Sequence, residues 1–186
     1  MNQFQQTIGV LHDAGVDFVV IGGVAITAHG SAHITYDLDI SYSRSRENIE
    51  RLVKALAPYH PRLRGAPTNL PFHLDTGTVT RGLNFTLDTD LGDIDLLGEV
   101  AGIGMYPAVL ASSIALEIFG YTCRVLSLEG LIRAKRAAGR PRDLAALPEL
   151  EARREAEIRL DAASEQRNVQ LEDAGRTKDE GEESNE

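Results

Sequence analysis

Two short segments of the chain each place a pair of aspartates one residue apart in a pattern typical of a buried strand. The segment "ITYDLDI" contains Asp37 and Asp39, and "GDIDLL" contains Asp93 and Asp95. Aspartate is depleted in strands and is seldom buried unless it is paired or bound to a metal. The two pairs therefore either line a solvated face of a sheet or hold a cation.

Side chains of a strand alternate between its two faces, so each aspartate pair shares one face of its strand. If the two strands are neighbours, three or four carboxylates meet. Two unit charges ~4 Å apart repel by roughly 4 kcal/mol at an effective dielectric of ~20. Such a group requires protons or a divalent cation, and oxygen-only ligands suit magnesium or manganese. If the strands are far apart, the pairs only face solvent.

A pair of glycines, Gly22 and Gly23, lies between the strand-like run "DFVVI" and the short helical run "VAITAHG". Glycine lets a ligand approach the backbone, and the N–H groups at a helix start attract anions. By itself this pattern is also typical of a plain tight turn. A phosphate-binding turn followed within ~15 residues by an acidic pair is the combination expected at a nucleoside triphosphate site.

The elements that would position these residues are predicted from periodicity, caps and turn residues. A capping box at Ser45, with Asn48 in place of the usual Glu or Gln, marks the start of one helix. The expected helices span residues 3–14, 24–30, 45–56, 128–139 and 141–158, and the expected strands span 17–23, 34–42, 83–98 (two strands and a turn) and 121–127.

Two stretches carry weaker periodicity. Residues 58–82 are rich in proline and glycine and predict a long loop, or a segment with little regular structure, of the kind that often carries function. Pro148 is expected to kink or break the last helix. Beyond about residue 160 apolar residues nearly vanish, which predicts a disordered tail.

Length and composition predict one folded domain over residues 1–150, followed by a helical extension over 151–186 that fades into an acidic disordered tail. The chain has 186 residues, of which 42% are hydrophobic and 25% charged. Its net charge of −9 lies mostly in the tail, so the body does not favour broad attraction to nucleic acid. A single cysteine, Cys123, fits a reducing compartment, and no run of ~20 apolar residues predicts a membrane span. We expect a cytoplasmic protein.

The segment "VIGGVAITAHGSAHITYDLDI" resembles the signature of the nucleotidyltransferase superfamily with the DNA polymerase β-like palm. "GDIDLL" is similar to its third-carboxylate strand, and "LSLEGLIRAKRAAGRPRDLAAL" resembles the C-terminal helices of the small bacterial branch, the AbiEii-type toxins and minimal nucleotidyltransferases. The resemblance covers roughly residues 5–150. It implies an α/β (α+β) fold, with a mixed sheet, helices on one face and additional C-terminal helices.

The resemblance also implies a reaction, the transfer of a nucleoside monophosphate from a nucleoside triphosphate (NTP) to an acceptor hydroxyl, with two Mg²⁺ or Mn²⁺ ions as cofactors. Asp37 and Asp39 would ligate both metals. Asp95 would complete the ligand set of one metal and accept the proton of the acceptor hydroxyl. Gly22 and Gly23 would hold the triphosphate through their N–H groups.

Two further features bear on triphosphate binding. Many relatives carry an arginine where this chain has His33, so Arg44 or Arg81 could supply the missing charge. In the C-terminal helices, Lys135 would contact the triphosphate. Lys135, Arg140 and Asp143 together match a Lys…Arg-x-x-Asp pattern of the family. Arg140 and Asp143 are expected to form a salt bridge on the helix surface.

Three functional hypotheses follow. The first is nucleotidyl transfer to a tRNA end, a protein hydroxyl or a small molecule, within a toxin–antitoxin or phage-defence pair. The second is a catalytically weak palm-fold protein that acts as an antitoxin-like binding partner, which His33 and the small size favour. The third is a transferase that modifies small molecules such as aminoglycosides.

Overall fold

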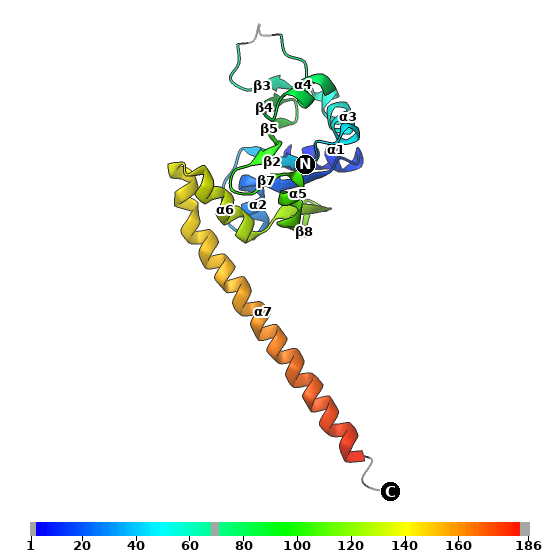
Figure 1. Cartoon of the computed structure of the whole chain (residues 1–186), viewed down its shortest axis with the longest axis vertical. Helices are drawn as coiled ribbons and strands as arrows, with labels where there is room; N and C mark the ends of the chain where they lie inside the picture. The colour runs from blue at the N-terminus through cyan, green and yellow to red at the C-terminus, as the bar shows by residue number, and fades with distance from the viewer. Residues whose placement is uncertain (1–2, 68–70, 183–186) are drawn as a thin grey trace. The chain divides into compact units, whose positions relative to one another are not determined.

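The computed structural model describes residues 3–67 and 71–182. The chain divides into two compact units, Met1–Leu147 and Pro148–Glu186. The first unit contains the β-sheet with its helices and both acidic segments, and the second contains most of one long helix (Figure 1).

A mixed sheet forms the centre of the first unit, as the family resemblance implies, and it has seven strands. Neighbours β1 and β9 are parallel, as are β2 and β5, and the other four pairs are antiparallel. In sheet order the strands are β3 (Arg62–Leu63), β4 (Asn84–Thr89), β5 (Gly92–Leu97), β2 (Asp37–Tyr42), β1 (Phe18–Ile21), β9 (Tyr121–Leu126) and β8 (Ser113–Ile118).

Helices of the first unit connect and cover these strands. α1 contacts β5 and β9, and α2 contacts β1 and β2. The helices are α1 (Gln3–Asp13), α2 (Gly22–Ala28), α3 (Arg46–Leu56), the 3-10 helix η1 (Ala57–Tyr59), α4 (Thr76–Arg81), α5 (Tyr106–Ala111) and α6 (Leu128–Ala138). Two further strands, β6 (Glu99–Val100) and β7 (Gly104–Met105), form a small separate hairpin.

Several elements differ from the sequence-based expectation. Within residues 58–82, the described part contains the two-residue strand β3 and the six-residue helix α4, so the segment is not one continuous loop but has the little regular structure that the sequence predicts. The elements β6 to β8 and α5 were not expected, because their runs are short and lack clear periodicity. Asp75 caps α4 through a hydrogen bond from the Thr78 N–H of 2.7 Å, a local signal of the kind that marks helix starts.

The alternation of acidic and apolar residues in β2 and β5 is confirmed. The four aspartates of these strands are only partly buried. Their neighbours on the opposite face have no exposed surface at all: Leu38, Ile40, Ile94 and Leu96. Burial of these side chains therefore fixes the register of the strands and directs the carboxylates to the other face.

Helix α7 (Pro141–Glu182) runs through both units. Pro148 lies inside the helix, so the expected break is not observed, and helix continues to Glu182 where composition predicts disorder. Ion pairs between Glu149 and Arg153 (3.0 Å) and between Glu155 and Arg159 (3.2 Å) have the i,i+4 spacing that supports local helix. Among the described helices, none combines the length and apolar character needed to cross a membrane.

Asn48 joins α3 to the two central strands. Its own N–H donates to the Ser45 cap at 3.2 Å, but its side chain is fully buried and does not complete a capping box. The side-chain amide instead bonds both backbone groups of Asp17, at 2.7 and 3.0 Å, and the carbonyl of Ser43 at 2.8 Å. These contacts tie the helix to the start of β1 and the end of β2.

We expect Asn48→Ala to lower the free energy of unfolding by roughly 2–3 kcal/mol, because it removes the three part-buried hydrogen bonds that the Asn48 side chain makes with Asp17 and Ser43. Lys54→Ala, at an exposed position of the same helix, should change it by no more than about 0.5 kcal/mol. Urea denaturation measures both values. Equal effects of the two substitutions would show that the Asn48 contacts do not stabilise the sheet.

Candidate active site

The parallel pairing of β2 with β5 brings the two acidic segments together. In this register Asp37 lies opposite Asp93, and Asp39 lies opposite Asp95. Asp37, Asp39 and Asp95 each offer one carboxylate oxygen, and these oxygens lie within 4.8 Å of one another. We call these three residues the acidic triad. The structure thus gathers the three carboxylates that the sequence singled out, while their role as metal ligands stays a prediction.

Asp39 is the triad member whose charge is most disfavoured. Burial, followed by repulsion from Asp37 and Asp95, raises the pKa of Asp39 to about 7. The Lys135 ammonium and a hydrogen bond from the Gly23 backbone N–H act in the opposite direction. A divalent cation would relieve this repulsion, and the all-oxygen donor set fits Mg²⁺ or Mn²⁺.

The glycine pair lets the backbone pass against the triad. Gly22 has φ +62°, and a Cβ there would lie 2.6 Å from Cγ of Asp39. A Cβ at Gly23 would lie 2.5 Å from the side chain of Thr35, which donates a 3.0 Å hydrogen bond to the Asp37 carboxylate. Both glycines are therefore required by close packing around Asp37 and Asp39. Triphosphate binding by their N–H groups stays a prediction.

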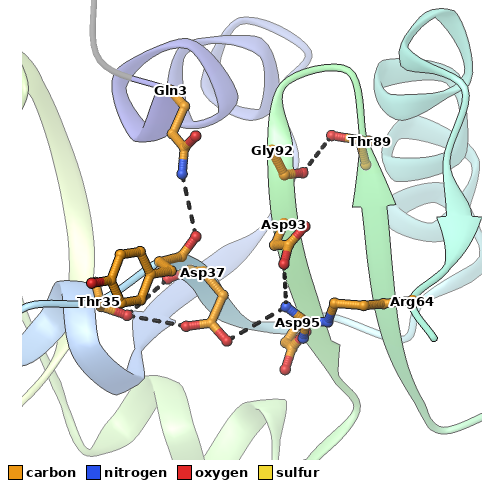
Figure 2. A network of polar contacts seen from close by, with 9 residues as sticks. Gln3, Thr35, Asp37, Arg64, Thr89, Gly92, Asp93 and Asp95 are labelled. Atoms are coloured by element: carbon orange, nitrogen blue, oxygen red, sulfur yellow. Dashed lines mark hydrogen bonds and ion pairs between the residues drawn. The ribbon is translucent and has the colours of Figure 1, made fainter.

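Arg64, which follows β3, is a functional candidate that the sequence reasoning missed. Its Nη1 lies 2.8 Å from the Asp93 carboxylate and 3.6 Å from that of Asp37. Its Nη2 donates to Asp95. Figure 2 shows the Arg64 side chain reaching across the sheet toward Asp93 and Asp95. The alternating "RLRG" run is the signal that could have predicted a cationic strand edge here.

Burial raises the pKa of Asp95, and Arg64 is the strongest influence that lowers it. Asp37 and Asp93 add to the increase, whereas Arg142 opposes it. The site therefore combines a surplus of carboxylates with cations from two separate regions of the chain. Such an arrangement can bind a metal–phosphate group, in which positive and negative charges occur together.

Lys135 lies near the triad, on α6, and is anchored by a buried carboxylate. Its Nζ donates to Asp143 at 2.7 Å, and Arg140 donates to the other oxygen of Asp143 at 2.6 Å. The predicted Arg140–Asp143 salt bridge is confirmed, but its placement on the surface is wrong, because Asp143 is fully buried. Lys135 as a triphosphate contact stays a prediction.

Arg44, which the sequence offered as a substitute cation, is engaged away from the triad. Arg44 donates to the Tyr42 hydroxyl at 3.0 Å and to the carbonyls of Gly82 (2.7 Å) and Thr80 (2.9 Å), so it fixes the end of α4. His33 is exposed. Among the residues that the structure describes, Arg64 is the cation that forms ion pairs with the triad.

No family model matches the chain, and no curated protein matches it. Several solved structures have a similar course of the chain. One is the crystal structure of TM1012 from Thermotoga maritima, a proposed nucleotidyltransferase, which is 18% identical in sequence. The similarity covers 87% of this chain and 91% of that chain, with a TM-score of 0.46. The solution structure of the antibiotic-resistance factor ANT(2″)-Ia has 16% identity, coverage of 90% and 96%, and a TM-score of 0.45. The crystal structure of ANT(2″)-Ia with adenylyl-2″-tobramycin has 14% identity, coverage of 82% and 93%, and a TM-score of 0.48. With identities and TM-scores this low, we base no functional assignment on these similarities.

We expect Gly22→Ala to destabilise the fold by more than the roughly 1–2 kcal/mol that a positive φ costs an ordinary residue, because its methyl group overlaps Asp39. Gly120→Ala is the matched control, since Gly120 has φ +86° and a methyl group there would meet no described atom within 4 Å. Thermal and urea unfolding compare the two variants. A Gly22 variant no less stable than the Gly120 variant contradicts the close packing described here.

Asp143→Asn should lower the free energy of unfolding by about 3 kcal/mol at neutral pH, because it leaves the Lys135 and Arg140 charges without their partner. Burial alone would raise the pKa of Asp143, but the hydrogen bonds from Lys135 and Arg140 lower it below 3.8 overall. A carboxyl group whose pKa is lower in the folded state than in the unfolded state stabilises the fold at every pH above its unfolded-state pKa. This stabilisation disappears as the pH falls through the folded-state pKa.

The difference between wild type and Asp143→Asn should therefore stay constant above pH 3.8 and shrink below it. Urea titrations over a pH series measure this difference. A difference that grows on acidification would contradict the assigned charge state.

Proposed function

We propose that the chain is a metal-dependent nucleotidyltransferase that transfers a nucleoside monophosphate from an NTP to an acceptor hydroxyl. The observation that carries this proposal is the meeting of Asp37, Asp39 and Asp95, with carboxylate oxygens within 4.8 Å of one another. The resemblance of the surrounding motifs to the polymerase β-like palm supports the same reaction.

In this proposal Asp37 and Asp39 would hold two Mg²⁺ or Mn²⁺ ions, and Asp95 would help to hold one of them. When bound, the metal would lower the pKa of the attacking hydroxyl and neutralise charge on the leaving pyrophosphate. The acceptor oxygen forms a bond to the α-phosphorus as the bond to the bridging oxygen breaks. Asp95 accepts the hydroxyl proton, and pyrophosphate leaves with the bridging oxygen.

Other residues would bind the substrate. Lys135 lies close enough to the triad for its charge to lower the pKa of Asp39, and its anchoring by Asp143 limits its movement. We propose that it contacts the triphosphate, together with the N–H groups of Gly22 and Gly23. The acceptor is a tRNA end, a protein hydroxyl or a small molecule, and a toxin–antitoxin pair is the proposed setting.

The second candidate function is that of a catalytically weak palm-fold protein that serves as an antitoxin-like binding partner. The ion pairs of Arg64 with Asp37 and Asp95 favour it, because they partly neutralise the triad. The exposed His33, where relatives carry arginine, also favours it.

Titration calorimetry with each NTP and Mg²⁺ separates the two candidates. For the enzyme we expect metal-dependent NTP binding that Asp37→Ala abolishes. Asp88→Ala should retain binding, because Asp88 lies in neighbouring β4 and pairs with Arg62 at 3.7 Å outside the triad. Absence of binding at millimolar ligand would favour the partner role.

Incubation of the protein with labelled NTPs and a cell extract then identifies the acceptor. Asp39→Asn should reduce label transfer by about a hundredfold or more, the scale associated with the loss of one charge-stabilising group. Asp88→Ala again provides the control. Label transfer that survives Asp39→Asn would contradict the proposed site.

A further inference from the structure

Charged side chains from four neighbouring strands share the face that carries the triad. The register places Arg62, Asp88, Asp93 and Asp37 in one row across β3, β4, β5 and β2. The next row on this face contains Thr86, Asp95 and Asp39. The Arg64 N–H bonds the Thr86 carbonyl at 2.9 Å, so Arg64 extends this second row.

Arg64 lies between the triad and Asp93. It forms ion pairs with Asp37 and Asp95, two of the three triad members, and with Asp93, which is not one of them. The Arg64 side chain is 30% exposed, so a path to solvent remains. A guanidinium here and a divalent cation at the triad would use the same carboxylates, and their like charges repel.

The backbone at Arg64 is fixed while its side chain is long. Besides the bond to Thr86, a turn follows in which the Ala66 N–H bonds the Leu63 carbonyl at 3.2 Å. Release of the triad therefore requires rotation of one side chain, with no rearrangement of the strand. Asp93, at 2.8 Å from Nη1, can keep its hydrogen bond to the guanidinium when the other two partners are lost.

We infer that Arg64 is a built-in counter-ion that a divalent cation must displace from Asp37 and Asp95, with Asp93 retaining the displaced guanidinium beside the site. The inference rests on the proposed metal site and adds its regulation. In the metal-free protein Arg64 holds the carboxylates together, and in the loaded protein its positive charge stays at the rim of the site. Metal affinity is consequently lower than the triad alone would give.

Mn²⁺ binding, followed through the electron paramagnetic resonance signal of the free ion, tests this inference without an activity assay. We expect Arg64→Gln to bind Mn²⁺ about tenfold more tightly than wild type, a difference of about 1.4 kcal/mol. Arg62→Gln is the matched control, because Arg62 lies on the same strand face but pairs with Asp88. Its affinity should stay close to that of wild type.

Thermal unfolding gives a second readout. Without metal, Arg64→Gln should melt at a lower temperature than wild type, because the triad loses the cation that forms ion pairs with Asp37 and Asp95. Added Mn²⁺ should raise its melting temperature more than that of wild type or Arg62→Gln, since tighter binding to the folded state stabilises it more.

The wild-type protein provides a measurement that does not depend on the folding of Arg64→Gln. The guanidinium ¹⁵N resonances of Arg64, assigned through their absence in Arg64→Lys, should shift on addition of Mg²⁺. The Arg62 resonances should change less. Unchanged Arg64 resonances at saturating Mg²⁺ would overturn the inference.

The outcomes separate this inference from the proposed function. Mn²⁺ binding of equal affinity in wild type and Arg64→Gln overturns the role of Arg64 and leaves the metal site standing. Binding by Arg64→Gln alone supports a counter-ion strong enough to block the site. Absence of binding in every folded variant overturns the metal site itself, and the inference with it.

Discussion

Mutual repulsion among carboxylates is the constraint on which the site depends. Backbone hydrogen bonds hold β2 and β5 at the ordinary strand spacing of about 4.8 Å, so Asp39 and Asp95 cannot move apart without breaking the sheet. The apolar side chains on the opposite face, such as Leu38 and Ile94, prevent a change of register. The fold therefore maintains an unfavourable charge cluster, which is a general property of sites that bind metal ions or shift protonation states.

The surrounding residues respond to this repulsion from different parts of the chain. Arg64 approaches from the β3 edge, whereas Lys135 approaches from α6 and is held by the buried Asp143. The Gly23 N–H adds a hydrogen bond to Asp39 from the first turn of α2. Each contact is one that a bound metal or phosphate could replace or reinforce. Electrostatic interactions with the carboxylates therefore connect the β3 edge, the start of α2 and the C-terminal helices of the first unit.

The sequence allowed a large part of the site to be predicted because strands have a local side-chain period. The alternation in "ITYDLDI" and "GDIDLL" places the aspartates on one face with no knowledge of the fold. The Ser45 cap and the Gly139 stop, which has φ +64°, were likewise readable from local signals. Arg64 was not, since β3 has two residues and too little periodicity to be recognised. The buried position of Asp143 was also missed. Its burial depends on how α6 and α7 pack, and the local sequence pattern does not encode that packing.

By itself, then, the sequence determined which side chains share a strand face, where α3 begins and α6 ends, and that three aspartates could form a cation site. Only the tertiary structure decided that β2 and β5 are parallel neighbours, that Asp39 lies opposite Asp95, and that Arg64 is the counter-ion. The physical reason is the range of the interactions. Caps and alternation arise from residues a few positions apart, whereas strand pairing and ion pairing join segments brought together by burial of the whole apolar face.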